Sequence, residues 1–110
     1  MRLRSDFWVS AYIRRCETAG ASAYLRRRGA AEAGAIFIRV DRLDGTSCLF
    51  GPAPQTEFAE ESVERRWVRM HDAPWLDNPE IEQRLQREVR FDTDLWIVDV
   101  EDREGRSFLD

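Results

Sequence analysis

The first clear hydrophobic pattern in the chain runs from Asp6 to Ala19. Its apolar side chains recur at spacings of three and four residues, which is the period of one face of an α-helix. They are Trp8, Ala11, Tyr12, Cys16 and Ala19, with Val9 and Ile13 alongside. We predict an amphipathic helix here, capped by Ser5 or Asp6. Gly20 should end it, because glycine readily adopts the left-handed conformation that follows a helix.

After Gly20 the pattern changes to the alternation that is typical of strands. Residues 21–28 and 35–42 both predict strands, and the Asp44-Gly45 pair that follows is a strong hairpin signal. A two-residue turn there would pair Val40 with Leu49. The same register would pair Asp41 with Cys48 and Arg39 with Phe50. The residues on the second face of the sheet would then be Phe37, Arg39, Cys48 and Phe50. That face is too apolar to lie in water, so we expect a helix or a partner to cover it.

The second half of the chain predicts a loop, a strand, a helix and a final strand. Residues 51–64 contain two prolines and four glutamates, which indicates a connecting loop, and residues 65–72 alternate again. Asp77 and Glu80 have the spacing of a capping box. The apolar residues that follow recur every four positions, as in a helix; they are Ile81, Leu85 and Val89. The nearly continuous apolar run at residues 95–100 predicts a central strand covered on both faces.

These elements predict an α+β fold with the order α-β-β-β-β-α-β, in which an antiparallel or mixed sheet of four to five strands carries two helices. A chain of 110 residues suits a single domain over residues 1–110. The longest apolar runs are only a few residues long, which excludes a transmembrane helix. The N-terminus has no signal-peptide core, so we expect a soluble cytoplasmic protein.

The composition excludes several kinds of chemistry. All 17 basic residues are arginines, so a Walker-type phosphate loop, a Schiff base and a pyridoxal anchor are excluded. Two cysteines and one histidine are too few for a structural zinc site. We predict no cofactor, and we favour a protein that is not an enzyme.

Charge is distributed unevenly along the chain. Residues 1–52 hold nine arginines and five acidic residues, a net charge of +4, whereas residues 53–110 hold eight arginines and sixteen acidic residues, a net charge of −8. On a strand, Tyr24, Arg26 and Arg28 would point the same way and could hold phosphates and stack a base. The net charge of −4 argues against a nucleic-acid partner. The alternatives are that the two halves pair inside the fold or that two copies associate.

Two further groups of residues are candidates for a site. Trp67, Arg69 and His71 would form a stacking platform if the intervening residues face the core, and would be ordinary core packing if the strand is turned over. Asp92 and Asp94 precede the last strand and could bind a metal ion, although aspartates at such a junction also form local Asx turns.

Three segments give the chain a resemblance to a known family. They are Ser5 to Ala11, Gly34 to Ile38 and, above all, Arg90 to Val98 with its Asp-Leu-Trp block. In these segments the chain resembles the small bacterial proteins grouped as domain of unknown function 1491, although Thr93 stands where the resemblance leads us to expect proline. The resemblance implies a single-domain bacterial cytoplasmic protein and implies no activity, cofactor or catalytic residue.

Three hypotheses about function follow. The first is a non-enzymatic interaction or regulatory module, which binds a protein partner or a second copy of itself through the second face of the sheet. The second is a single-stranded nucleic-acid binder, which would use Tyr24, Arg26 and Arg28, together with the Trp67, Arg69 and His71 stripe. The third is a carboxylate-dependent or metal-dependent hydrolase that uses Asp92 and Asp94.

Overall fold

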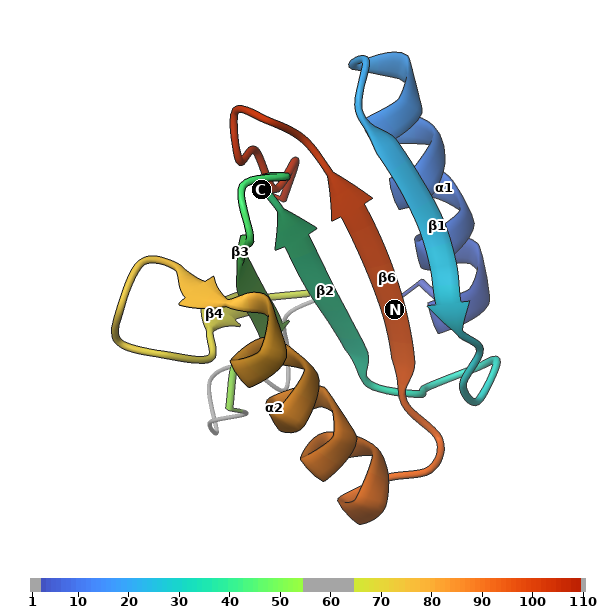
Figure 1. Cartoon of the computed structure of the whole chain (residues 1–110). Coiled ribbons are helices and arrows are strands. Elements are labelled where there is room, and N and C mark those ends of the chain that lie inside the picture. Colours follow the sequence, from blue (N-terminus) through green and yellow to red (C-terminus); the bar gives the residue numbers. More distant parts are fainter. Residues whose placement is uncertain (1–2, 55–64, 110) are drawn as a thin grey trace.

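The computed structural model describes residues 3–54 and 65–109 (Figure 1). The elements in chain order are α1 (Ser5–Thr18), β1 (Ser22–Arg27), β2 (Ile36–Asp41), β3 (Thr46–Pro52), β4 (Trp67–Arg69), β5 (Leu76–Asp77), α2 (Asn78–Phe91) and β6 (Trp96–Glu101). Over the described ranges the strands form one sheet in the order β1-β6-β2-β3-β4, and β5 pairs with β3. β6 runs parallel to β2, and the other pairs are antiparallel. The predicted α+β class is confirmed, with a mixed sheet and the short β5 as an addition.

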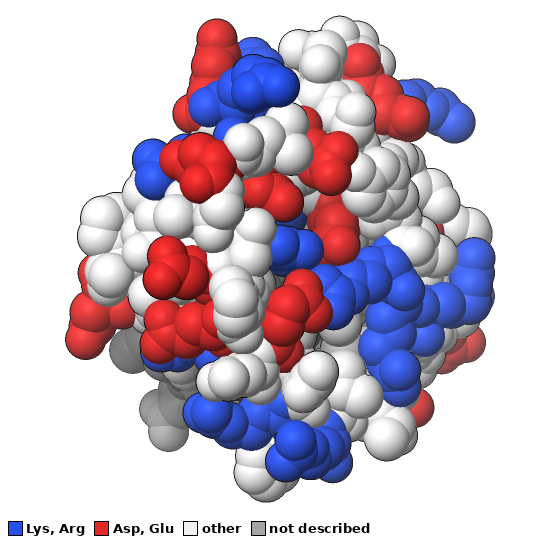
Figure 2. Space-filling model, in the orientation of Figure 1, with Lys and Arg blue, Asp and Glu red and all other residues white. Residues whose placement is uncertain are grey.

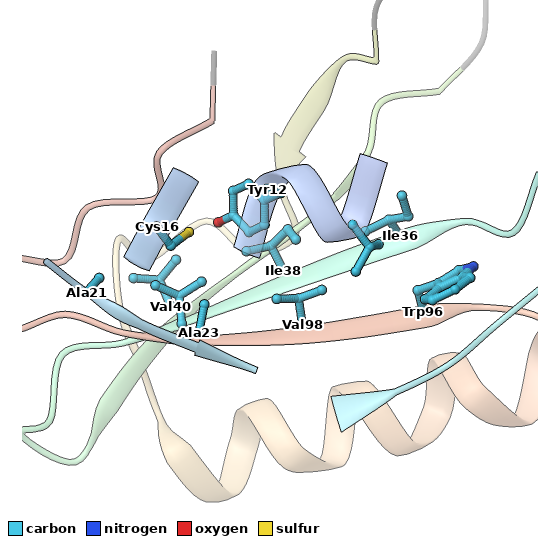
Figure 3. Close-up of a cluster of buried hydrophobic side chains, with 11 residues drawn as sticks. Tyr12, Cys16, Ala21, Ala23, Ile36, Ile38, Val40, Trp96 and Val98 are labelled. Carbon is cyan, nitrogen blue, oxygen red and sulfur yellow. The ribbon is translucent and has the colours of Figure 1, made fainter. Parts of the chain in front are cut away.

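The two helices cover opposite faces of the sheet, as Figure 3 shows. α1 packs against β1 and β6, whereas α2 packs against β3 and β5. The second face is therefore covered by a helix of the same chain, which was one of the two predicted coverings. The apolarity that suggested self-association through this face is explained without a second copy. No helix among residues 3–54 and 65–109 is long and apolar enough to cross a membrane.

Alternation along the central strands sorts the apolar side chains into two clusters. On the α1 face, the α1-face cluster consists of Val9, Tyr12, Cys16, Ala21, Ala23, Ile36, Ile38, Val40, Trp96, Val98 and Val100 (Figure 3). On the α2 face, the α2-face cluster consists of Phe37, Leu49, Ile81, Leu85, Leu95 and Ile97. β6 contributes to both clusters, which confirms the prediction that residues 95–100 form a central strand.

The predicted register of the β2–β3 hairpin is wrong by one residue. Val40 pairs with Cys48 rather than with Leu49, because the Arg42 N–H donates to the Thr46 oxygen and leaves a loop of three residues. The same shift pairs Arg39 with Leu49 and Asp41 with Ser47. Cys48 and Phe50 therefore lie on the α1 face, and Leu49 takes their predicted place on the α2 face.

Side chains around the hairpin loop explain why it is longer than predicted. Leu43 has a φ of 66° and Gly45 a φ of 92°, so the loop has two residues in the left-handed region. Asp41 Oδ1 accepts a hydrogen bond from the Leu43 N–H at 2.8 Å, and Asp44 Oδ1 accepts one from the Thr46 N–H at 3.0 Å. These bonds hold a conformation that leucine would otherwise disfavour.

The predicted helix caps do not form. Arg4 occupies the position before α1, and the Ser5 hydroxyl donates to the Gly34 oxygen at 2.7 Å instead of capping the helix. The first backbone N–H groups of α1 donate to carbonyl oxygens of residues 31 and 32. Asp77 does precede α2, but its side chain makes no capping bond. Gly20 ends α1 with a φ of 96°, as predicted.

Candidate functional site

A β-bulge separates the three residues that were predicted to point the same way. The pairing of β1 with β6 shifts register after Leu25, so the side-chain alternation is interrupted there. The Arg28 guanidinium lies 5.3 Å from the ring centre of Trp96, which belongs to the α1-face cluster. Tyr24 and Arg26 lie on the α2 face. The prediction is therefore wrong for Arg28.

Arg26 takes part in an ion network on the α2 face, together with Arg39, Glu82, Asp99 and Asp41. Arg26 Nη1 donates to Glu82 Oε1 at 2.8 Å and lies 3.6 Å from Asp99 Oδ2. Arg39 lies 3.3 Å from Glu82, 3.8 Å from Asp99 and 3.6 Å from Asp41. The basic half of the chain thus pairs with the acidic half inside the fold, which was one of the alternatives for the uneven charge.

Burial and pairing act in opposite directions on the carboxylates of this ion network. The hydrogen bond from Arg26 lowers the pKa of Glu82. Burial raises the pKa of Asp99, although both arginines oppose the effect. The Asp99 Oδ1 atom is buried and has no hydrogen-bond partner among the described residues. Nearby, a hydrogen bond to Glu101 raises the pKa of Tyr24 to about 12.

A pocket of about 460 Å³ lies next to the ion network, between the end of β1 and the C-terminal half of α2. Its lining consists of Arg26, Arg27, Leu85, Gln86, Val89, Arg90 and Ile97. Figure 2 shows arginine side chains gathered over the end of β1, beside α2. The volume falls within the range of small-molecule sites. We call this feature the arginine pocket.

Two of the three arginines in the arginine pocket have no acidic partner among the residues that the structure describes. Arg27 Nη2 donates to the Thr93 oxygen at 3.0 Å, and its Nε atom is buried without a hydrogen-bond partner among the residues described. Arg90 is exposed, and neither it nor Arg27 forms an ion pair within residues 3–54 and 65–109. Arg26 is compensated by Glu82. The pocket therefore carries two arginines that form no ion pair with described residues, and their guanidinium groups suit a planar or tetrahedral anion.

The predicted stripe of Trp67, Arg69 and His71 lies at the edge of the sheet opposite β1. The Trp67 ring lies 5.0 Å from that of Trp8 and packs against the α1-face cluster, so it follows the packing alternative. The Leu49 N–H donates to His71 Nε2 at 3.1 Å, and His71 Nδ1 donates to the Ala73 oxygen at 2.5 Å. The histidine thus continues the hydrogen bonding of β3 beyond β4.

Asp92 and Asp94 form a local turn. The Asp94 N–H donates to Asp92 Oδ1 at 2.9 Å, which is the bond of an Asx turn. The Asp94 carbonyl accepts the Ala30 N–H at 2.8 Å and ties the loop before β2 to the loop before β6. In the described part of the chain, no group of three or more histidine, cysteine and acidic side chains could hold a metal ion.

The arginine pocket was missed by the sequence reasoning, apart from Arg26. Arg27 lay within the basic run, and Gln86, Val89 and Arg90 share one side of α2 at spacings of three and four residues. This periodicity was a usable signal for a common stripe. Nothing in the pattern indicated that the stripe would lie beside the end of β1.

Comparison with known proteins identifies the family. A family model described as "Protein of unknown function (DUF1491)" matches residues 3–110. The chain belongs to the DUF1491 family. The resemblance seen in three short segments is therefore confirmed over nearly the whole length.

Solved structures of similar proteins support the DUF1491 fold. A DUF1491 protein from Caulobacter crescentus CB15, solved by crystallography, is 40% identical, with a TM-score of 0.80, and the match covers 99% of this chain and 94% of that one. The solution structure of an A. tumefaciens protein is 46% identical, with a TM-score of 0.78, over 92% of this chain and 86% of that one. A search of curated proteins finds no match.

Proposed function

We propose that this DUF1491 protein is a non-enzymatic interaction module, and that it binds an anionic group of its partner in the arginine pocket. The chemistry of the lining carries this proposal. The polar residues of the pocket are three arginines and one glutamine, and the lining contains no histidine, cysteine or carboxylate. Such a pocket offers charge and directed hydrogen bonds but no general acid or base.

The compartment and source belong to the same proposal. We propose a bacterial cytoplasmic protein. The free, buried thiols of Cys16 and Cys48 support a reducing compartment, because paired cysteines are common only in oxidising ones. The solved relatives from C. crescentus and A. tumefaciens support a bacterial source.

Inorganic phosphate is the probe for the proposed site. Titration of the isotopically labelled protein, followed by NMR, should give saturable shifts of the Arg27 and Arg90 side-chain N–H signals. Arg27→Gln and Arg90→Gln should each weaken phosphate binding by at least about tenfold, since a hydrogen bond to a charged group contributes about 1.5–3 kcal/mol. Incubation with methyl phosphate should leave the ester intact, as expected of a module that only binds.

Arg103→Gln is the matched control for these variants. Arg103 is exposed, lies outside the pocket and has no ion pair with the described residues. The Arg103→Gln variant should therefore leave phosphate binding unchanged. Shifts that do not saturate, or that are equally large at Arg103, would show that phosphate only screens surface charge and would refute the site.

Single-stranded nucleic acid is the second candidate partner, and one observation favours it. Phe91 is 85% exposed and directly follows Arg90, which lines the arginine pocket, so an exposed aromatic ring is the chain neighbour of a lining cation. In a fluorescence-anisotropy titration with a mixed-sequence oligonucleotide, Phe91→Ala should weaken binding by at least fivefold at low salt. Binding that does not respond to Phe91→Ala would remove this candidate.

A further inference from the structure

We propose that the natural ligand of the arginine pocket is a small phosphate monoester with a short aliphatic chain. Its phosphate would bind Arg27 and Arg90, and its chain would lie along Val89 and the methylene stems of the pocket arginines. This inference rests on the proposed function and names the ligand class for the same site. Charge, lining and volume each support it.

Charge favours a phosphate monoester over a carboxylate. Arg27 and Arg90 bring two positive charges without an ion pair among the described residues, and a phosphate monoester carries a charge of about −1.5 to −2 at neutral pH. Its three terminal oxygens can also accept hydrogen bonds from two guanidinium groups at once.

The lining favours a ligand that also has an apolar part. Val89 is half-buried at the margin of the α2-face cluster, whereas Leu85 and Ile97 are buried members of that cluster. These side chains are therefore fixed by packing before any ligand arrives. The methylene stems of Arg26, Arg27 and Arg90 add apolar surface around them. A purely polar ligand would leave the exposed part of Val89 and these stems in contact with water.

The volume favours a ligand larger than a bare anion. A pocket of about 460 Å³ would hold many waters, since each occupies roughly 30 Å³ in the liquid. Inorganic phosphate has only five non-hydrogen atoms, so it would leave most of this space filled by water against apolar side chains. Replacing that water with an aliphatic chain is favourable.

A series of phosphate esters tests the inference. Inorganic phosphate, methyl phosphate and butyl phosphate are titrated into the full chain, with the NMR signals of Arg27 and Arg90 as the readout. We expect affinity to rise about two- to fourfold for each added methylene group, the upper value being that of a fully buried group. Arg27→Gln should weaken binding of every member of the series by a similar factor.

Two threonine variants separate the apolar contact from the charge contact. Val89→Thr keeps the shape of the side chain and should reduce the preference for butyl phosphate over inorganic phosphate by about threefold, with inorganic phosphate binding unchanged. Val68→Thr is the matched control, because Val68 is 36% exposed on β4 and lies outside the pocket. Circular dichroism spectra identical to that of the natural chain would show that both variants are folded.

The outcomes distinguish the inference from the proposed function. Equal binding of inorganic and butyl phosphate, both sensitive to Arg27→Gln, would overturn the inference and leave the anion site standing. Failure of every ester and of inorganic phosphate to bind would overturn both. Cosedimentation with vesicles of equal parts phosphatidylcholine and phosphatidylglycerol, lost in Arg27→Gln, would assign the site to lipid headgroups and overturn the assignment to a free small molecule.

Discussion

The two faces of the sheet differ in what they bury. On the α1 face, the side chains of β2 and β6 are apolar at every position along the strands, and they are Ile36, Ile38, Val40, Trp96, Val98 and Val100. On the α2 face, the same strands begin apolar with Phe37 and Ile97 and continue with Arg39 and Asp99. One face is a continuous core, whereas the other changes from core to ion network along its length.

This difference assigns most of the stability to the α1 face and ligand binding to the α2 face. The arginine pocket lies on the α2 face, with Ile97 of the α2-face cluster in its lining and Arg26 of the ion network at its edge. Burial of charged groups costs free energy that the α1-face cluster must offset. The α1 face should therefore dominate the free energy of unfolding, and changes on the α2 face should affect stability less and ligand binding more.

The largest expected effect is on the α1 face. Ile38 lies on β2, between β6 and β3, and its side chain is fully buried. Ile38→Ala therefore removes apolar contacts and leaves a cavity. We expect the free energy of unfolding to fall by about 2–5 kcal/mol, as measured by urea denaturation. Phosphate binding by the folded fraction should be unchanged. A loss below about 1 kcal/mol would contradict the assignment of stability to this face.

The next largest effect concerns the ion network. Here we expect replacement of Arg39 to lower the free energy of unfolding more than replacement of Asp99. The Arg39 side chain is only 12% exposed and contacts Glu82, Asp99 and Asp41. Arg39→Met removes one of the two cations that compensate Glu82 and Asp99, and we expect a loss of about 1–3 kcal/mol in urea denaturation at neutral pH. Asp99→Asn should cost less than about 1 kcal/mol, because burial already disfavours the charged form of Asp99.

A double variant checks that these two residues act on each other. Because Arg39 and Asp99 belong to one ion network, the loss in the Arg39→Met, Asp99→Asn chain should be smaller than the two single losses added together. Additive losses would mean that the 3.8 Å approach of their side chains contributes no coupling. An Asp99→Asn loss larger than that of Arg39→Met would reverse our ranking of the two charges.

The same contrast explains how far the sequence could predict this structure. Strand β6 was predicted as central because a continuous run of apolar, β-prone residues suits only a strand covered on both faces. The α1 face follows from simple alternation in the same way. The Asp44-Gly45 signal, however, fits both a two-residue and a three-residue loop. The choice depends on the positive φ of Leu43 and on the hydrogen bond that the Leu43 N–H donates to Asp41 Oδ1.

The candidate site was less predictable than the fold for two physical reasons. The bulge after Leu25 is a local change of pairing that leaves no mark in the hydrophobic pattern, and it decides where Arg27 and Arg28 point. The arginine pocket also requires residues of β1 and α2 that are far apart in the sequence, such as Arg27 and Arg90. Periodicity describes one element at a time, so it could not bring these two together.

The smallest expected effect is a change in the pH dependence of stability. Glu82 has a folded-state pKa below its ordinary 4.5, so its contribution to stability is present above pH 4.5 and is lost as the pH falls. Asp99 has a folded-state pKa above its ordinary 3.8, so its contribution is present below pH 3.8 and is lost as the pH rises. Within one ion network, the two carboxylates therefore give stability opposite slopes against pH.

Neutral variants should separate these two slopes. Between about pH 3 and 6, Glu82→Gln should make the acid loss of stability shallower than in the natural chain, and Asp99→Asn should make it steeper. The measurement is urea denaturation at a series of pH values. The Glu82 effect should be well below about 1 kcal/mol, because its side chain is 34% exposed and water screens the pair. Slopes that change in the same direction in both variants would show that burial does not dominate at Asp99, and the α2 face would then be an ordinary solvated ion-pair surface.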